Sequence, residues 1–145
     1  MAARSNSSDG GVWRRGGDHW ILPIEGQLVT QLRFDYGLTF LFEEGLDVRV
    51  EQAFVLHRAG DEDLLMDPEG DHELLAPVLR LGRATVMGGL AFDDGRLELT
   101  FAEGSRLSVP SSDQYEAWQL NGPGGVLVVS VGAGALVTWG LGAQP

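Results

Sequence analysis

The stretch FAEGSRLSV (residues 101–109) decides the fold, because it has a near copy in FEEGLDVRV (residues 42–50). In both stretches a phenylalanine is followed by a turn that contains glycine, and then by side chains that alternate between apolar and polar or small. This alternation is the period of a half-buried strand, and glycine permits the tight turn before it. The pair of stretches therefore predicts a duplicated β structure.

Outward from these stretches, the copies extend over about residues 27–56 and 85–110. Each copy predicts three antiparallel strands joined by two hairpin turns, and the second copy carries the turn sequence DDG, a strong hairpin signal. The apolar residues of the first two strands correspond in pairs: Leu32 with Leu90, Phe34 with Phe92, Leu38 with Leu97, Phe40 with Leu99 and Phe42 with Phe101. Each copy is thus predicted to be a meander with one apolar face.

A lone three-stranded sheet cannot hide its apolar face, whereas two such sheets can cover each other. A third β region, residues 115–139, adds strands around the turn sequence NGPGG, and residues 71–82 predict one short helix capped by Asp71 and starting or kinking at Pro77. The predicted fold class is mainly β, with duplicated meanders packed as a sandwich or a curled half-barrel of eight to nine strands.

The 145 residues suit one domain. Residues 1–18 are rich in Ser, Gly and Arg without an apolar period, which predicts a flexible tail. Residues 19–140 are predicted to form a single β-rich domain with the internal repeat, and residues 141–145 a second tail. The sequence leaves open the strand order and the choice between sandwich and barrel.

The charge of the chain is strongly negative, at −11 overall, and all ten basic residues are arginine. Residues 19–145 hold seven arginines against nineteen acids, so they carry about −12. Such a surface repels nucleic acid and anionic lipid, which argues against both as partners, and it attracts a basic protein. Solubility alone is the other interpretation. No apolar run suits a signal peptide or membrane span, which predicts a cytoplasmic protein.

Catalytic motifs are missing from the sequence, which predicts that the protein is not an enzyme and uses no cofactor. The chain has no cysteine, and its three histidines, His19, His57 and His72, are not at metal-ligand spacing. They are interpreted as surface or cap residues. The acidic pairs lie in turns, where exposure to solvent argues against the burial that would raise the pKa of a catalytic carboxyl group. We therefore predict no catalytic, cofactor-binding or metal-binding residue.

The segment AGDEDLLMDPEGDHE (residues 59–73) carries seven carboxylates and no Lys or Arg. It does not match a calcium-binding loop, so the alternatives are a solvated loop and a surface that binds a protein partner. Tyr115 is a further candidate contact, because it lies on the opposite parity from Trp118. The candidate partner-binding residues are Asp61, Glu62, Asp63, Asp67, Glu69, Asp71, Glu73 and Tyr115.

The combination of LPIEGQLVTQLRFDYGLTFLFEEG, LAFDDGRLELTFAEG and YEAWQLNGPGGVLVVSV resembles a family of small uncharacterised bacterial proteins, chiefly actinobacterial, over residues 20–140. The family has no assigned activity, so the resemblance identifies no catalytic residue in this chain. In its small size, acidity and β content the chain is also similar to immunity proteins that neutralise a toxin.

The leading functional hypothesis is a non-enzymatic acidic module that binds a protein partner, for example a toxin. One alternative is a small-molecule-binding protein or enzyme with its site between the repeated sheets. The other is a structural homo-oligomer, such as a homodimer formed through edge strands. The sequence does not identify the partner, and it does not show whether a ligand pocket exists.

Overall fold

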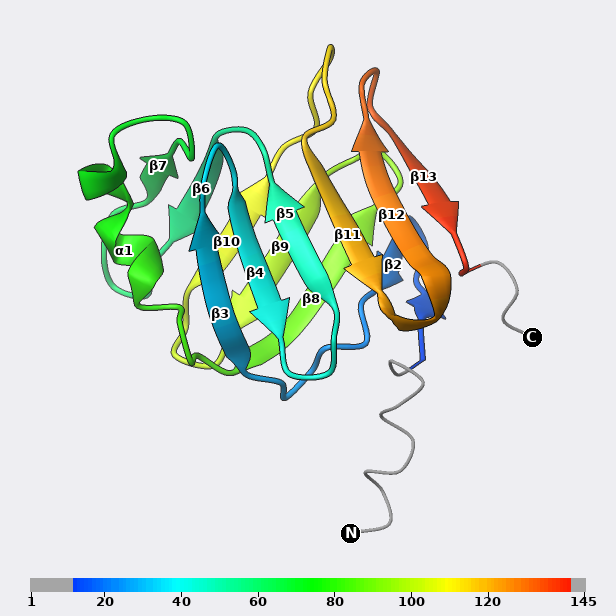
Figure 1. The fold of residues 1–145 in the computed structure, drawn as a ribbon, viewed down its shortest axis with the longest axis horizontal. Coiled ribbons are helices and arrows are strands. Elements are labelled where there is room, and N and C mark those ends of the chain that lie inside the picture. Colours follow the sequence, from blue (N-terminus) through cyan, green and yellow to red (C-terminus); the bar gives the residue numbers. More distant parts are fainter. Residues whose placement is uncertain (1–11, 142–145) are drawn as a thin grey trace, which may run out of the picture.

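The computed structural model describes residues 12–141, in which thirteen strands form two antiparallel sheets (Figure 1). The six-stranded sheet has the order β13-β12-β11-β5-β4-β3, and the seven-stranded sheet β1-β2-β8-β9-β10-β6-β7. The first sheet contains β3 (Val29–Phe34), β4 (Leu38–Phe42), β5 (Asp47–Val50), β11 (Trp118–Gly122), β12 (Val126–Val131) and β13 (Ala135–Trp139). The second contains β1 (Arg14–Arg15), β2 (His19–Ile21), β6 (Phe54–His57), β7 (Leu64–Met66), β8 (Val86–Phe92), β9 (Leu97–Phe101) and β10 (Arg106–Val109).

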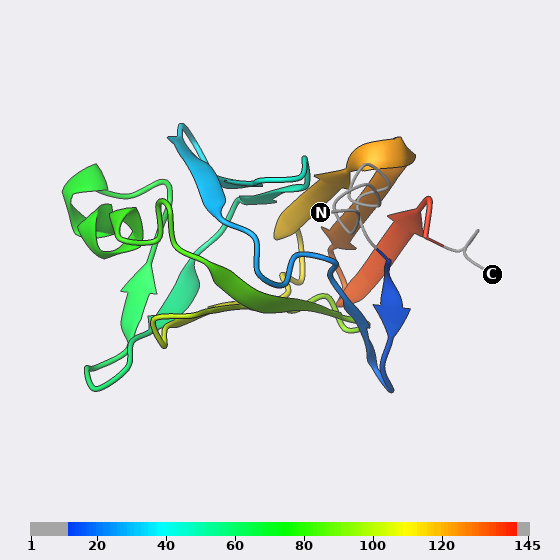
Figure 2. The same ribbon diagram turned by 90° about the horizontal axis from the view of Figure 1, so that it is seen from below.

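The predicted fold class is confirmed: the protein is mainly β, and its two meanders, β3-β4-β5 and β8-β9-β10, lie in different sheets that face each other (Figure 2). The sheets do not close into a barrel, and the further strands β1, β2, β6 and β7 bring the count above the eight or nine expected. Phe42 and Phe101 are 3% and 1% exposed, and the rings of Phe40 and Phe101 lie 6.4 Å apart. Each such buried ring contributes about 1.5–3 kcal/mol to folding.

The two repeats exchange their next strands. After β5 the chain crosses to the seven-stranded sheet, where β6 pairs with β10, and after β10 it crosses back, where β11 pairs with β5. The starts of β3 and β8 are joined directly, because Val86 N–H donates to the Gln27 carbonyl and Arg83 N–H to the Val29 carbonyl, both at 2.8 Å. The exchange of β6 and β11 between the repeats connects the two sheets at the end where the chain crosses from one to the other.

The predicted correspondence between the two copies, Leu90 with Leu32 and Phe92 with Phe34, is wrong by one residue. In the first copy Phe34 pairs with Leu38. In the second copy the residue that pairs with Leu97, the equivalent of Leu38, is Ala91 and not Phe92. The hairpin of the second copy is therefore two residues longer. Gly89 and Ala91 therefore face the core. A side chain at Gly89 would come within 3.1 Å of Leu22 and Ile24, so only the smallest residues fit there, and Leu90 and Phe92 lie on the outer face.

The helical segment is as short as predicted. A 3₁₀ turn (η2, His72–Leu75) begins at Asp71, whose carboxylate accepts the Glu73 N–H at 3.0 Å. It leads into α1 (Ala76–Leu79), which has Pro77 in its first turn, where the missing N–H costs nothing. Leu75 and Val78 are buried, whereas Leu74 and Leu79 are exposed. The helical end thus covers one side of the core without being enclosed by it.

Several described residues of the two predicted tails are part of the fold. Arg14–Arg15 form β1 and pair with β2, and Trp13 is only 8% exposed, with its ring 6.5 Å from that of Trp20. Leu141 is fully buried. A two-residue strand shows no period in the sequence, so burial of Trp13 and Leu141 was not foreseeable from it. The remainder of the predicted tails, residues 1–11 and 142–145, lies outside the described residues.

Candidate functional site

An open groove lies where the two crossings leave the sheets, and we call it the tyrosine groove. Its volume is about 610 Å³. It is bordered by the turn between β3 and β4, by the crossing from β5 to β6, by the loop between β7 and η2, and by the long loop between β10 and β11 that projects from the top of the molecule in Figure 1. The lining residues are Tyr36, Arg49, Glu51, Gln52, Glu69, Tyr115 and Glu116.

Tyr36 is 84% exposed, the most of any large apolar or aromatic side chain in the described residues. It lies in a three-residue turn in which the Asp35 carboxylate accepts the Gly37 N–H at 2.8 Å. A Cβ at Gly37 would lie 2.9 Å from the Val50 carbonyl oxygen and 3.0 Å from the guanidinium of Arg49. The turn is thus pressed against β5 at Gly37, while the Tyr36 side chain is exposed to solvent.

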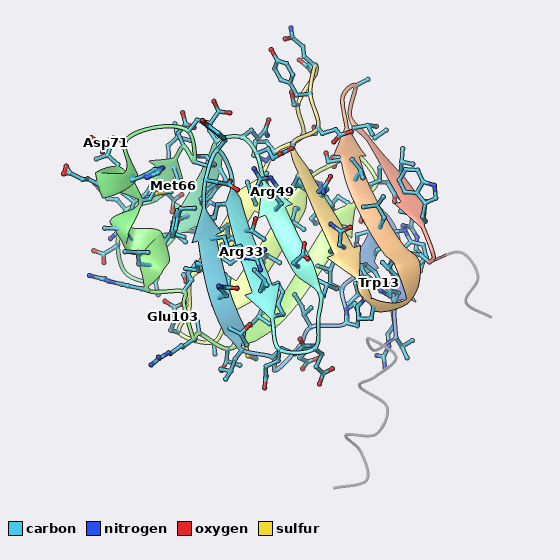
Figure 3. All side chains as sticks on the ribbon, in the orientation of Figure 1. Trp13, Arg33, Arg49, Met66, Asp71 and Glu103 are labelled. Carbon is cyan, nitrogen blue, oxygen red and sulfur yellow. The ribbon has the colours of Figure 1, made fainter. Side chains whose placement is uncertain are left out.

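Arg49 lies at the floor of the groove and contacts two carboxylates. Its Nε donates to Glu51 Oε2 at 2.9 Å, and its Nη2 lies 3.0 Å from Asp35 Oδ1. These contacts raise the pKa of Arg49, and hydrogen bonds from Arg49 and from the Gly37 N–H lower the pKa of Asp35. In Figure 3, Arg49 lies on the outer face of the six-stranded sheet. Its charge is already balanced by two carboxylates, so it is a structural cation.

Tyr115 is 69% exposed and is supported by its own loop. The Ser112 hydroxyl accepts the N–H groups of Gln114 and Tyr115 at 3.2 and 3.1 Å. The Gln52 side chain donates to the Pro110 carbonyl, which joins this loop to the other crossing. The two exposed tyrosines, 79 positions apart in the chain, are therefore presented by separate braced segments at the same groove.

The predicted acidic surface is divided between several places. Glu69 reaches the tyrosine groove together with Tyr115, whereas Asp61 lies with Arg58 and Arg80 in a different hollow near Glu103. Asp71 caps the helical segment, on the left in Figure 3, and Asp67 accepts the Glu69 N–H in its own loop. Glu62 and Glu73 are exposed outside both hollows. Of the eight candidate residues, only Glu69 and Tyr115 share one site.

Asp63 belongs to a second cluster, on the outer face of the seven-stranded sheet. The Nδ1 atom of His57 lies 2.9 Å from Asp63 Oδ2, and its Nε2 atom lies 3.1 Å from Ser108 Oγ. His57 ends β6 and Ser108 lies in β10, and both are half-buried. The three side chains form a serine–histidine–aspartate row.

Sequence reasoning missed both groupings for one reason. Tyr36 stands in a turn of ordinary appearance, and Ser108 stands on the polar parity of a strand, where a serine carries no signal. The partners of each become neighbours only because β6 pairs with β10 and because the β10–β11 loop leads back to the six-stranded sheet, where β11 pairs with β5. Within residues 12–141 no group of three or more histidine and acidic side chains is arranged to hold a metal ion. No helix in that range is long and apolar enough to cross a membrane.

The chain belongs to a family of unknown function, DUF6188, whose model matches residues 20–140. No curated protein and no solved structure matches the chain. The matched range contains every residue of the tyrosine groove and of the serine–histidine–aspartate row.

Proposed function

We propose that this protein is an acidic module that binds a basic protein partner, with the tyrosine groove as the place where a cationic side chain of the partner docks. The observation that carries the proposal is the meeting of two strongly exposed tyrosines with three glutamates at one groove. Exposed tyrosine is a common anchor in protein interfaces, because its ring is apolar and its hydroxyl is polar.

The electrostatics of the groove favour a cation. Arg49 is the single basic residue of the lining, against Glu51, Glu69 and Glu116. Because Arg49 is paired with Glu51 and Asp35, the charges that remain are the carboxylates of Glu69 and Glu116. A guanidinium or ammonium group in the groove gains from the face of a tyrosine ring and from these carboxylates together.

The net charge of about −12 on residues 19–145 supports the same choice, since it speeds the encounter with a basic partner. A toxin is the narrower form of this proposal, in which the module acts as an immunity-type inhibitor. We place this role in the cytoplasm, as the sequence predicts.

The experiment is a capture assay with the immobilised full-length chain and extract of the native host, at low and at moderate salt. We expect one stoichiometric basic partner, whose affinity falls at least tenfold with the double substitution Tyr36→Ala and Tyr115→Ala. Trp139→Ala is the matched control, because Trp139 is an aromatic residue 51% exposed on β13, outside the groove.

Two results would contradict the proposal. One is the lack of any stoichiometric partner at both salt concentrations. The other is a partner that binds the double variant, the Trp139→Ala variant and the unmodified chain equally well, as judged by titration calorimetry with the purified partner.

A further inference from the structure

We propose that Ser108 is an activated nucleophile, with His57 as its base and Asp63 as the residue that positions His57, and that this row transfers the acyl group of small neutral or cationic carboxylic esters to water. This inference goes beyond the proposed binding role and uses the opposite outer face of the molecule, because Ser108 and His57 lie in the seven-stranded sheet and Arg49 in the six-stranded one.

The order of the hydrogen bonds suits proton transfer. The Asp63 carboxylate can only accept, so the Nδ1 atom of His57, 2.9 Å away, carries the hydrogen. In the neutral ring the Nε2 atom is then the acceptor, and it lies 3.1 Å from Ser108 Oγ, within range of the hydroxyl proton. A serine bonded to a histidine that is held by a carboxylate is the arrangement that activates a hydroxyl nucleophile.

The strand pairing makes this geometry specific. β6 and β10 are antiparallel neighbours in which Arg106 is opposite His57 and Ser108 is opposite Val55, so His57 and Ser108 are diagonal neighbours on one face. His57 is anchored from both of its nitrogen atoms, which fixes the ring plane. The histidine side chain is 27% exposed and Asp63 60%, so a substrate can approach the row from solvent.

A shallow hollow of about 210 Å³ adjoins Ser108. Val55 and Pro110 supply apolar surface there, and the full lining is Val55, Arg96, Leu97, Glu98, Ser108, Val109 and Pro110. Its size suits an acyl group of a few carbon atoms. Glu98 pairs with Ser108 across β9 and β10, so its carboxylate opposes anionic substrates and leaves neutral and cationic esters as the favoured class.

The oxyanion has one candidate donor in this hollow. Backbone N–H groups of β10 are directed at β6 and β9, between which it lies, so a side chain has to serve. Arg96 lines the hollow; its Nε atom bonds to the Asp94 carboxylate, and its guanidinium carbon lies 4.2 Å from the centre of the Phe92 ring. To donate to the negative oxygen that develops on the substrate carbonyl, its Nη groups have to turn from the Phe92 ring toward β10 when the substrate binds.

The reaction balances without a cofactor. The Ser108 Oγ–H proton passes to His57 Nε2 as the Oγ–carbon bond forms, and the same proton goes to the leaving alkoxide as the carbon–OR bond breaks. Water then attacks the acyl–serine and gives its proton through His57 to Ser108, so that ester and water yield acid and alcohol.

The experiment is covalent labelling of the full-length chain with an alkyl fluorophosphonate, followed by intact mass spectrometry and peptide mapping. The probe forms an Oγ–phosphorus bond with loss of fluoride and of the serine proton. We expect one adduct, on Ser108, formed at least tenfold faster than on any other serine. His57→Gln is expected to reduce the rate at least tenfold, and 4-nitrophenyl butyrate hydrolysis is expected to fall in parallel.

The controls separate reactivity from stability. Ser111→Ala removes a half-buried serine near the same loop and should leave labelling unchanged, whereas Ser108→Ala should abolish it. Asp63→Ala should slow labelling several-fold and Asp63→Glu should restore it, since a positioning carboxylate is replaceable by another. Thermal melts should be the same for all variants. Labelling that is no faster than that of Ser108→Ala, or that is insensitive to His57→Gln, would overturn the inference.

Discussion

The hairpins that open the two repeats occupy equivalent places and differ in what holds them. The turn of the first copy, residues 35–37, presents Tyr36 to solvent and contacts β5 through Asp35 and Gly37. The turn of the second copy, residues 92–96, is fastened from inside, where the Gly95 carbonyl accepts the Trp118 Nε1–H at 2.9 Å and the Ser130 hydroxyl at 2.7 Å. We call the turn at residues 92–96, which is bonded to the core, the pinned hairpin, and the turn at residues 35–37, which exposes Tyr36, the open hairpin.

The pinned hairpin is also fastened from outside. Arg15 makes two hydrogen bonds to the Asp93 carboxylate, at 2.8 and 2.6 Å, and its guanidinium lies 5.2 Å from the ring centre of Trp20. The Asp93 N–H donates to the Asp18 carbonyl at 2.9 Å. The difference teaches that the duplicated strands build the core, whereas the segments outside the repeat decide which hairpin is free to make contacts.

The largest effect is expected from Trp118→Phe. Trp118 is fully buried, and the substitution removes a donor to Gly95 and leaves a cavity in the core. We expect the free energy of unfolding to fall by about 2–4 kcal/mol. Urea denaturation measures this change, and hydrogen exchange should accelerate at residues 93–96 more than at residues 35–37. Equal acceleration in both hairpins would show that Trp118 does not pin one of them selectively.

Gly37→Ala is expected to cost less, about 1–3 kcal/mol, because the added methyl group must displace the Val50 carbonyl or the Arg49 guanidinium. The same variant should reduce partner binding in the capture assay, since Arg49 forms the floor of the tyrosine groove. Gly17→Ala is the control, because its Cβ would meet no atom within 4 Å. A Gly37→Ala protein as stable as the control would contradict the close approach of the turn to β5.

Acid titration should separate the hairpins with a smaller effect on stability. Hydrogen bonding to Arg15 lowers the pKa of Asp93, and hydrogen bonding to Arg49 lowers that of Asp35, both from an ordinary value of 3.8. Because the folded-state pKa values are lower, the stabilisation is present above the ordinary value and is lost as the pH falls through the folded-state values.

Carboxyl carbon NMR measures these two pKa values directly. Arg15→Gln should raise the pKa of Asp93 and leave that of Asp35 in place, and Arg49→Gln should do the reverse. If one substitution moved both values, the two hairpins would be coupled, and the separation drawn between them would fail.

Tyr36→Ala is expected to have the smallest effect on folding, within about 0.5 kcal/mol, because 84% of the side chain is already exposed. Thermal unfolding with Trp139→Ala alongside measures it. A loss above 1 kcal/mol would mean that Tyr36 packs as a structural residue, and its exposure would then say nothing about a partner.

The sequence predicted the secondary structure well where the signal is local. Leu97, Leu99 and Phe101 are buried at the positions expected from Leu38, Phe40 and Phe42, and Gly45 and Gly104 share a positive φ in the matching turns. It placed Leu90 and Phe92 on the wrong face, because apolar parity alone does not reveal a hairpin two residues longer. It named Glu69 and Tyr115, but not Tyr36.

By itself the sequence determined that this protein is a duplicated antiparallel β structure with glycine turns, an apolar face on each ribbon and a negative surface. These features depend on residues within one or two strands of each other, where backbone geometry and side-chain parity act directly. Only the tertiary structure decided the exchange of β6 and β11, the tyrosine groove and the row of Ser108, His57 and Asp63. Those depend on packing between segments distant in the chain, and no local pattern records which segments will meet.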